Sequence, residues 1–129
     1  MPDETPSRRQ IDRFILEEID SVPHLEALLL VWRRRPANWS YGDLARALYL
    51  SEDRTFEVVR SLLERGLIVE VGGQRSRFAL LLESKDKEML LESLDLTYRR
   101  ELVRVSHMIH SKASPGVLDF ARAFRFKKD

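Results

Sequence analysis

Hydrophobic residues recur every three or four positions over most of the chain, which is the spacing of helices that bury one face. In residues 10–20, Ile11, Phe14, Ile15 and Ile19 recur at helical spacing. Acidic side chains fill most of the other face, so this stretch predicts an amphipathic helix. Ser21 and Pro23 then predict a break and a new start, because serine caps helices and proline is tolerated in a first turn.

The helical pattern continues over three further stretches. A second predicted helix runs from His24 to Arg35 and ends before Pro36, since the residue that precedes a proline favours extended backbone. DLARAL at 43–48 and residues 54–65 predict two more helices, separated by the turn YLSED. Gly66 follows the last of them, in the position where helices commonly end on glycine.

After Gly66 the period changes from helical to strand-like. In residues 67–71 the side chains of Leu67, Val69 and Val71 alternate with those of Ile68 and Glu70. GGQR at 72–75 is typical of a tight turn, and Phe78, Leu80 and Leu82 alternate on the way back. The sequence therefore predicts that the helices at 24–35, 43–48 and 54–65 are followed by a β-hairpin.

A long helix is predicted from about Asp86 to Lys112. Its apolar stripe consists of Leu91, Leu94, Tyr98, Leu102, Val105 and Ile109. Two interpretations of this stripe stay open: it forms the contact of a homodimer, or it folds back on the first helix, Ile11–Ile19. Ser114 and Pro115 predict a last short helix, followed by the basic and aromatic residues FRFKKD.

The order of these elements resembles the winged helix-turn-helix domain of small bacterial transcription regulators. The motifs that carry the resemblance are DLARAL at 43–48, VVRSLLERGLI at 58–68 and IVEVGGQRSRFAL at 68–80. It implies a mainly α fold with a small β-hairpin wing and covers residues 23–82. An N-terminal arm and helix would occupy 1–22. Residues 83–129 would contain the long helix, for which dimerisation is one of the two open roles, and the short terminal helix.

The resemblance also implies a DNA-binding surface. On the second helix of the motif, Arg54 and Ser61 would reach base edges and Arg60 would meet phosphate. On the wing, the expected contacts are Gln74, Arg75 and Arg77. A plainer interpretation stays open for each set, because Asp53, Glu57 and Glu64 share the helical face with these cations, and Arg77 can pair with Glu70 across the hairpin.

Charge and composition narrow the classes of function. The formal net charge is only +1, which argues against a protein that coats nucleic acid through bulk charge. The chain has no cysteine, so disulfides, zinc-thiolate sites and cysteine nucleophiles are excluded. The N-terminus lacks the apolar core of a signal peptide and no apolar run is long enough to span a bilayer, so a cytoplasmic protein without membrane contact is expected.

No catalytic motif is found in the sequence. His107 and His110 lie three positions apart, but without a nearby carboxylate they are interpreted as surface or interface histidines. We therefore expect no enzyme activity, no cofactor and no metal site. The first hypothesis is a homodimeric regulator that binds double-stranded DNA. The alternative is a winged-helix interaction module without DNA binding, in which the aromatic C-terminal tail docks on a protein partner.

Overall fold

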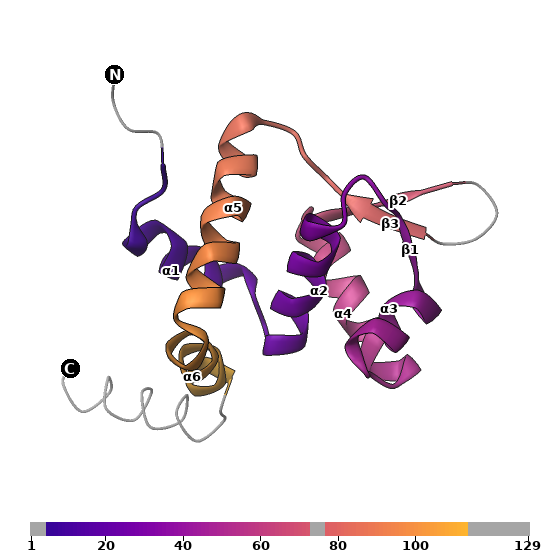
Figure 1. Cartoon of the computed structure of the whole chain (residues 1–129). Coiled ribbons are helices and arrows are strands. Elements are labelled where there is room, and N and C mark those ends of the chain that lie inside the picture. The colour runs from indigo at the N-terminus through magenta and orange to yellow at the C-terminus, as the bar shows by residue number, and fades with distance from the viewer. Residues whose placement is uncertain (1–4, 73–76, 114–129) are drawn as a thin grey trace, which may run out of the picture.

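The computed structural model describes residues 5–72 and 77–113. Their elements, in chain order, are α1 (Arg8–Glu18), α2 (Val22–Arg33), β1 (Trp39–Ser40), α3 (Tyr41–Leu48), α4 (Glu52–Glu64), β2 (Ile68–Val71), β3 (Arg77–Leu80), α5 (Lys85–Arg100) and α6 (Leu102–Ala113). In Figure 1, α3, α4 and the sheet lie on one side of α2, while α1, α5 and α6 lie on the other. None of the helices in the described ranges is both long and apolar enough to cross a membrane.

Serine side chains begin four of these helices. The hydroxyls of Ser7, Ser40, Ser51 and Ser84 each accept a hydrogen bond from the backbone N–H three residues later, at 3.0–3.2 Å. Such caps satisfy backbone donors that a helix start otherwise leaves without a partner. The cap at Ser40 starts α3 at Tyr41, two residues before the predicted start at Asp43.

The predicted hairpin is confirmed and belongs to a three-stranded antiparallel sheet of order β1-β3-β2. The central strand places Phe78 between Trp39 of β1 and Glu70 of β2, and its ring is fully buried. Gly66 precedes β2 with φ +70°, a backbone conformation that glycine adopts without the steric cost of a side chain. The predicted end of α4 at this glycine is therefore confirmed.

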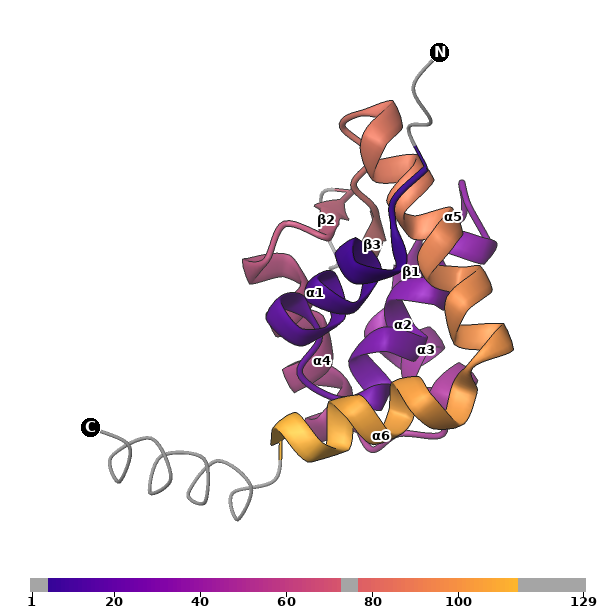
Figure 2. The ribbon, with the colours of Figure 1, turned by 90° about the vertical axis from the view of Figure 1, so that its left-hand side faces the viewer.

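The prediction of a single long C-terminal helix is wrong. Glu101 leaves the helical conformation, with φ −128° and ψ 45°, and divides the segment into α5 and α6. Figure 2 shows that α6 turns away from the direction of α5 and crosses the molecule. Because of this turn, apolar side chains of both helices reach the same core.

The apolar stripe of these helices packs inside the protomer. Its members Leu91, Leu94, Tyr98, Val105 and Ile109 are at most 8% exposed within the single chain, and α1 contacts both α5 and α6. This corrects the expectation that the stripe forms a dimer contact, since these five side chains keep almost no exposed surface that a partner could bury. The other interpretation, folding back on Ile11–Ile19, describes the structure. Leu102 alone of the six predicted residues is exposed, at 51%.

Ion pairs and hydrogen bonds fix the C-terminal helices to the rest of the chain. Arg104 of α6 donates to both carboxylate oxygens of Asp12 in α1, at 3.0 and 3.1 Å. Arg33 of α2 donates to Asp95 of α5 through Nε and Nη2, at 2.8 and 2.6 Å. One continuous core includes side chains of α1, α2, α4, α5 and α6. The segments 1–22, 23–82 and 83–129 that the sequence suggested therefore contribute to the same core.

Candidate nucleic-acid interface

The helices α3 and α4 form a helix-turn-helix. Leu44 of α3 and Val58 and Val59 of α4 are buried against each other and the core. Tyr49 turns the chain between the helices in the left-handed region, with φ 56° and ψ 43°, and its side chain is 94% exposed. Leu50 then donates its backbone N–H to the carbonyl of Ala45 at 3.0 Å, which closes the turn. The packing leaves one face of α4 directed at solvent.

That outward face of α4 consists of Asp53, Phe56, Glu57, Arg60 and Glu64, which are all exposed. Arg60 Nε donates to Glu64 at 3.0 Å, but the side chains are 69% and 65% exposed, so water screens the pair. The guanidinium of Arg60 is therefore accessible to a phosphate, as the sequence suggested. Three carboxylates on the same face oppose that contact.

The other two predicted side chains of α4 are directed at the junction between α1 and α2. Ser61 Oγ donates to Asp20 at 2.9 Å. Arg54 donates to Ser21 Oγ at 3.2 Å and to Glu57 at 2.9 Å. These bonds tie α4 to the end of α1, so base reading by Arg54 and Ser61 would require them to give up partners within the chain. Their contact with bases stays a prediction.

Arg77 lies at the base of the wing and faces the start of α3. Its Nε donates to Asn38 Oδ1, and its Nη2 lies 3.3 Å from the carbonyl of Asn38 and 3.5 Å from Asp43 Oδ2. The strand register pairs Glu70 with Phe78, so Glu70 and Arg77 project from opposite faces of the hairpin. Gln74 and Arg75, the predicted contacts at the wing tip, lie outside the described residues.

Arg46 is a further exposed cation that the sequence reasoning did not single out. It projects from α3, its side chain is 75% exposed, and it donates to Asp43 at 2.7 Å. Hydrogen bonds from the backbone and the hydroxyl of Ser40 keep the pKa of Asp43 below its usual value, and Arg46 and Arg77 act in the same direction. The position of Arg46 on the polar face of DLARAL is the sequence feature from which it could have been predicted.

An aromatic row beside these cations also escaped the sequence reasoning. The ring of Tyr41 contacts the buried Phe78 edge-on, at 4.8 Å between centroids, and stacks on Phe56 at 5.7 Å. Phe56 is 52% exposed, so the row runs from the core to the surface of α4. Tyr41 and Phe56 line a hollow of about 410 Å³ together with Gly42, Glu52 and Asp53. Burial, followed by the charge of Glu70, raises the pKa of Tyr41.

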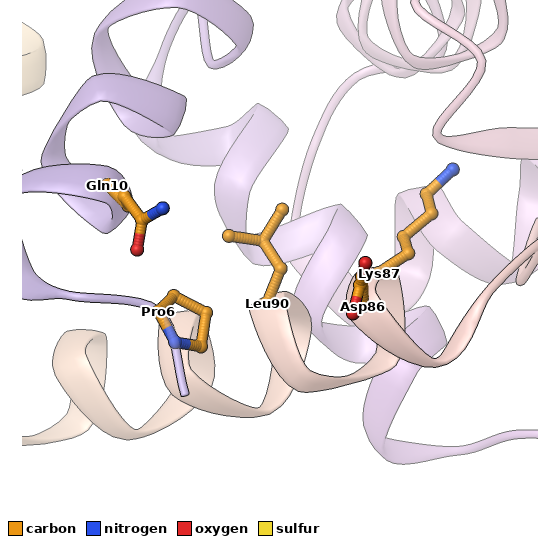
Figure 3. Close-up of a pocket in the computed structure, with 5 residues that line it drawn as sticks. All are labelled: Pro6, Gln10, Asp86, Lys87 and Leu90. Atoms are coloured by element: carbon orange, nitrogen blue, oxygen red, sulfur yellow. The ribbon is translucent and has the colours of Figure 1, made fainter. Parts of the chain in front are cut away.

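A larger hollow lies away from the helix-turn-helix, between α1 and α5. Its volume is about 580 Å³, and Pro6, Gln10, Asp86, Lys87 and Leu90 line it (Figure 3). Two of its polar side chains already have partners. Gln10 accepts the backbone N–H of Ser7 at 2.7 Å, and Lys87 donates to the carbonyl of Gly66 at 2.9 Å. In residues 5–72 and 77–113, no three His, Asp or Glu side chains are grouped closely enough to hold a metal ion.

The helix-turn-helix, followed by a hairpin whose central strand pairs with β1, defines the winged-helix class. Solved structures with this fold include a MarR family transcriptional regulator, SPO1453 from Silicibacter pomeroyi DSS-3. It is 23% identical, with 94% of this chain and 85% of that chain covered and a TM-score of 0.53. MepR, a transcription regulator of the Staphylococcus aureus multidrug efflux pump MepA, is 16% identical, with 93% and 85% covered and a TM-score of 0.53.

The adhesin competence repressor AdcR from Streptococcus pyogenes is also similar in structure. It is 16% identical, with 92% of this chain and 86% of that chain covered and a TM-score of 0.51. No family model matches the chain. No curated protein matches it either. The likeness therefore lies in the fold, which is that of MarR-type winged-helix regulators.

Proposed function

We propose that the protein is a transcription regulator that binds double-stranded DNA through its winged helix-turn-helix. The proposal rests on the arrangement of α3, α4 and the hairpin. Solved transcription regulators have the same fold, and the structural match covers more than nine-tenths of this chain. A helix of this kind fits the major groove, with the wing beside it on the backbone.

Three arginines are the proposed phosphate contacts within the described residues. Arg60 projects from the outward face of α4, Arg46 from α3 and Arg77 from the base of the wing. Each is more than two-fifths exposed and is held only by a solvated carboxylate or amide, so a phosphate can replace its partner at small cost. Gln74 and Arg75 remain proposed wing contacts on sequence grounds.

The acidic side chains of α4 limit the affinity that this surface offers. Residues 52–65 contain four acidic and three basic side chains, a formal charge of −1. Phosphate contacts supply most non-specific affinity, so we expect non-specific binding near the weak end of its usual range, a Kd of about 10⁻⁴ M at physiological salt. Specific binding then depends on base contacts in the right sequence.

We further propose that the regulator is a homodimer, because paired winged helices match two half-sites about one turn of DNA apart. The apolar side chains left exposed at the α5–α6 junction are Leu102, at 51%, and Val103, at 81%. We propose Leu102 and Val103 as the dimer contact, in place of the apolar stripe of α5 and α6 that is buried within the protomer. A Leu102→Asp, Val103→Asp variant should sediment as a monomer where the unchanged chain sediments as a dimer. Leu82→Asp, an exposed leucine beyond β3, is the matched control and should not dissociate the dimer.

The DNA proposal is tested by fluorescence anisotropy of a mixed-sequence duplex titrated with the full chain over a salt series. Removing a phosphate contact should weaken binding and lower the slope of log K against log salt by about 1. We expect this for Arg60→Ala and Arg77→Ala. Arg100→Ala, an equal charge change on α5, should leave the slope unchanged. If the unchanged chain does not bind even at low salt, the proposal fails and the protein-interaction alternative takes its place.

A further inference from the structure

Around the turn between α3 and α4, the surface exposes more aromatic area than the fold requires. Tyr49 is 94% exposed and Phe56 is 52% exposed, although Phe56 stacks on Tyr41. The stacking orients Phe56 along the rim of the hollow that it lines with Tyr41. Exposed apolar surface beside a hollow commonly marks a place that another segment or molecule covers.

The charged side chains that line the hollow itself are both acidic. Glu52 and Asp53 line the same hollow, and Glu57 follows one turn later. Glu57 pairs with Arg54 at 2.9 Å, whereas no ion pair of Glu52 or Asp53 occurs among the residues that the structure describes. Acidic side chains in the first turn stabilise a helix, which explains Glu52 and Asp53 at the start of α4. It does not explain why the aromatic rings beside them are exposed. The surface therefore fits an occupant that is both aromatic and cationic.

Residues 114–129 of the same chain, SPGVLDFARAFRFKKD, have this chemistry. They contain three phenylalanines, four basic side chains and two acidic ones. We propose that this segment docks on the aromatic and acidic surface formed by Tyr41, Tyr49, Glu52, Asp53, Phe56 and Glu57. Aromatic side chains would cover the exposed rings, and arginines and lysines would meet the carboxylates and the ring faces.

The position of the end of α6 places the segment within reach. Lys112 donates to the carbonyls of Ile15 and Leu16 at the end of α1, at 3.3 and 2.9 Å. Asp20, just beyond, accepts hydrogen bonds from Ser61 and Arg65 of α4. The chain therefore leaves α6 on the side where α4 meets α1. The 13 residues of α4 span about 20 Å, whereas 16 extended residues span up to roughly 50 Å.

Docking has a regulatory consequence, and this consequence alone rests on the proposed function. The segment would cover the outward face of α4, which is the face proposed to enter the major groove. DNA and the tail would then compete for α4, and the tether gives the tail a high effective concentration. Removing the tail's positive charges would free α4 for DNA.

The test uses the absence of cysteine from the chain, which allows a single nitroxide label on an Ala123→Cys variant. Paramagnetic broadening of backbone amide signals then reports which residues the tail approaches, with no DNA present. We expect the amides of residues 52–57 to lose much more intensity than those of residues 88–95 on α5. Raising the salt from about 0.05 M to 0.5 M shortens the screening length from roughly 14 Å to 4 Å and should restore most of the lost intensity.

Two variants and one mixed sample make the result decisive. Glu52→Gln, Asp53→Asn and Glu57→Gln together should abolish the broadening, as should Arg125→Gln, Lys127→Gln and Lys128→Gln in the tail. A mixture of unlabelled ¹⁵N protein with spin-labelled ¹⁴N protein should show no broadening, because docking is within one chain. The proposal is overturned if residues 52–57 lose no more intensity than residues 88–95, or if the mixture reproduces the effect through a second copy. Because DNA is absent, docking and DNA binding can fail separately.

Discussion

Replacing Asp95 by alanine removes the carboxylate that ties α5 to α2. Asp95 is only 7% exposed and accepts two hydrogen bonds from Arg33, at 2.8 and 2.6 Å. Arg99 also lies 3.3 Å from its second oxygen. The variant leaves the guanidinium of Arg33 beside an apolar core without its anionic partner.

The cost follows from these contacts. Removing one member of a buried ion pair costs about 3–5 kcal/mol. The side chain of Arg33 is 37% exposed, so water recovers part of this, and we expect a loss of about 2–3 kcal/mol in the free energy of unfolding. For 129 residues, each kcal/mol corresponds to about 3–4 °C, so Tm should fall by roughly 6–12 °C.

Urea unfolding followed by tryptophan fluorescence measures this loss, because Trp32 is buried on the same helix as Arg33. Glu92→Ala, an exposed change on α5, is the control and should stay within about 0.5 kcal/mol of the unchanged chain. A cycle with Arg33→Met should give a coupling energy of roughly 1 kcal/mol or more. A loss below about 0.5 kcal/mol for Asp95→Ala would mean that the pair of Arg33 and Asp95 does not stabilise the fold.

Three further predictions concern stability. Burial lowers the pKa of His24, and Arg54 and Arg65 act in the same direction while Asp20 opposes them. The native state therefore disfavours the protonated form of His24, so its contribution to stability is full above about pH 6.5 and falls as the pH is lowered below that value. In urea unfolding at pH 7.5 and 5.5, the His24→Gln variant should lack this pH-dependent part of the free energy of unfolding. Phe78→Ala empties the centre of the sheet and should cost about 3–5 kcal/mol in chemical unfolding. Gly66→Ala forces a side chain into φ +70° and should lower the unfolding free energy by about 1–2 kcal/mol.

Each of these predictions has an outcome that contradicts it. For His24, it is an equal loss of stability between the two pH values in the variant and the unchanged chain. For Phe78, it is a cost below about 1 kcal/mol, which would mean that the ring is not a core residue. For Gly66, an unchanged or raised free energy of unfolding would mean that the left-handed conformation is absent.

Periodicity predicted most of the fold because it records directly which face of an element is buried. The helical spacing before Gly66 and the alternation after it gave the order of helices and hairpin that the structure has. Residues that favour turns also predicted where elements end, as Gly66 did for α4. These signals are local in sequence, so they needed no knowledge of tertiary contacts.

The break between α5 and α6 could not be predicted in this way, because no proline or glycine marks it and the apolar stripe continues across it. A contact distant in sequence holds Glu101, because Arg8 lies 2.7 Å from its carboxylate. Arg104, three residues further along the chain, donates to both oxygens. The hydrogen bond with Arg104 also lowers the pKa of Glu101. A helical wheel likewise placed Arg54 and Ser61 on the polar face of α4. It did not show that Ser21 and Asp20 of the α1–α2 junction would meet them.

Contact of α3, α4 and the wing with DNA can be mapped directly from the amide chemical shifts of the full chain during titration with duplex DNA. The titration is done at about 0.05 M salt, because phosphate contacts are stronger at low salt. We expect progressive shifts in residues 41–64 and in the hairpin strands 68–71 and 77–80, with α5 unchanged. Shifts confined to α5 and α6, or no shifts at all, would contradict this expectation.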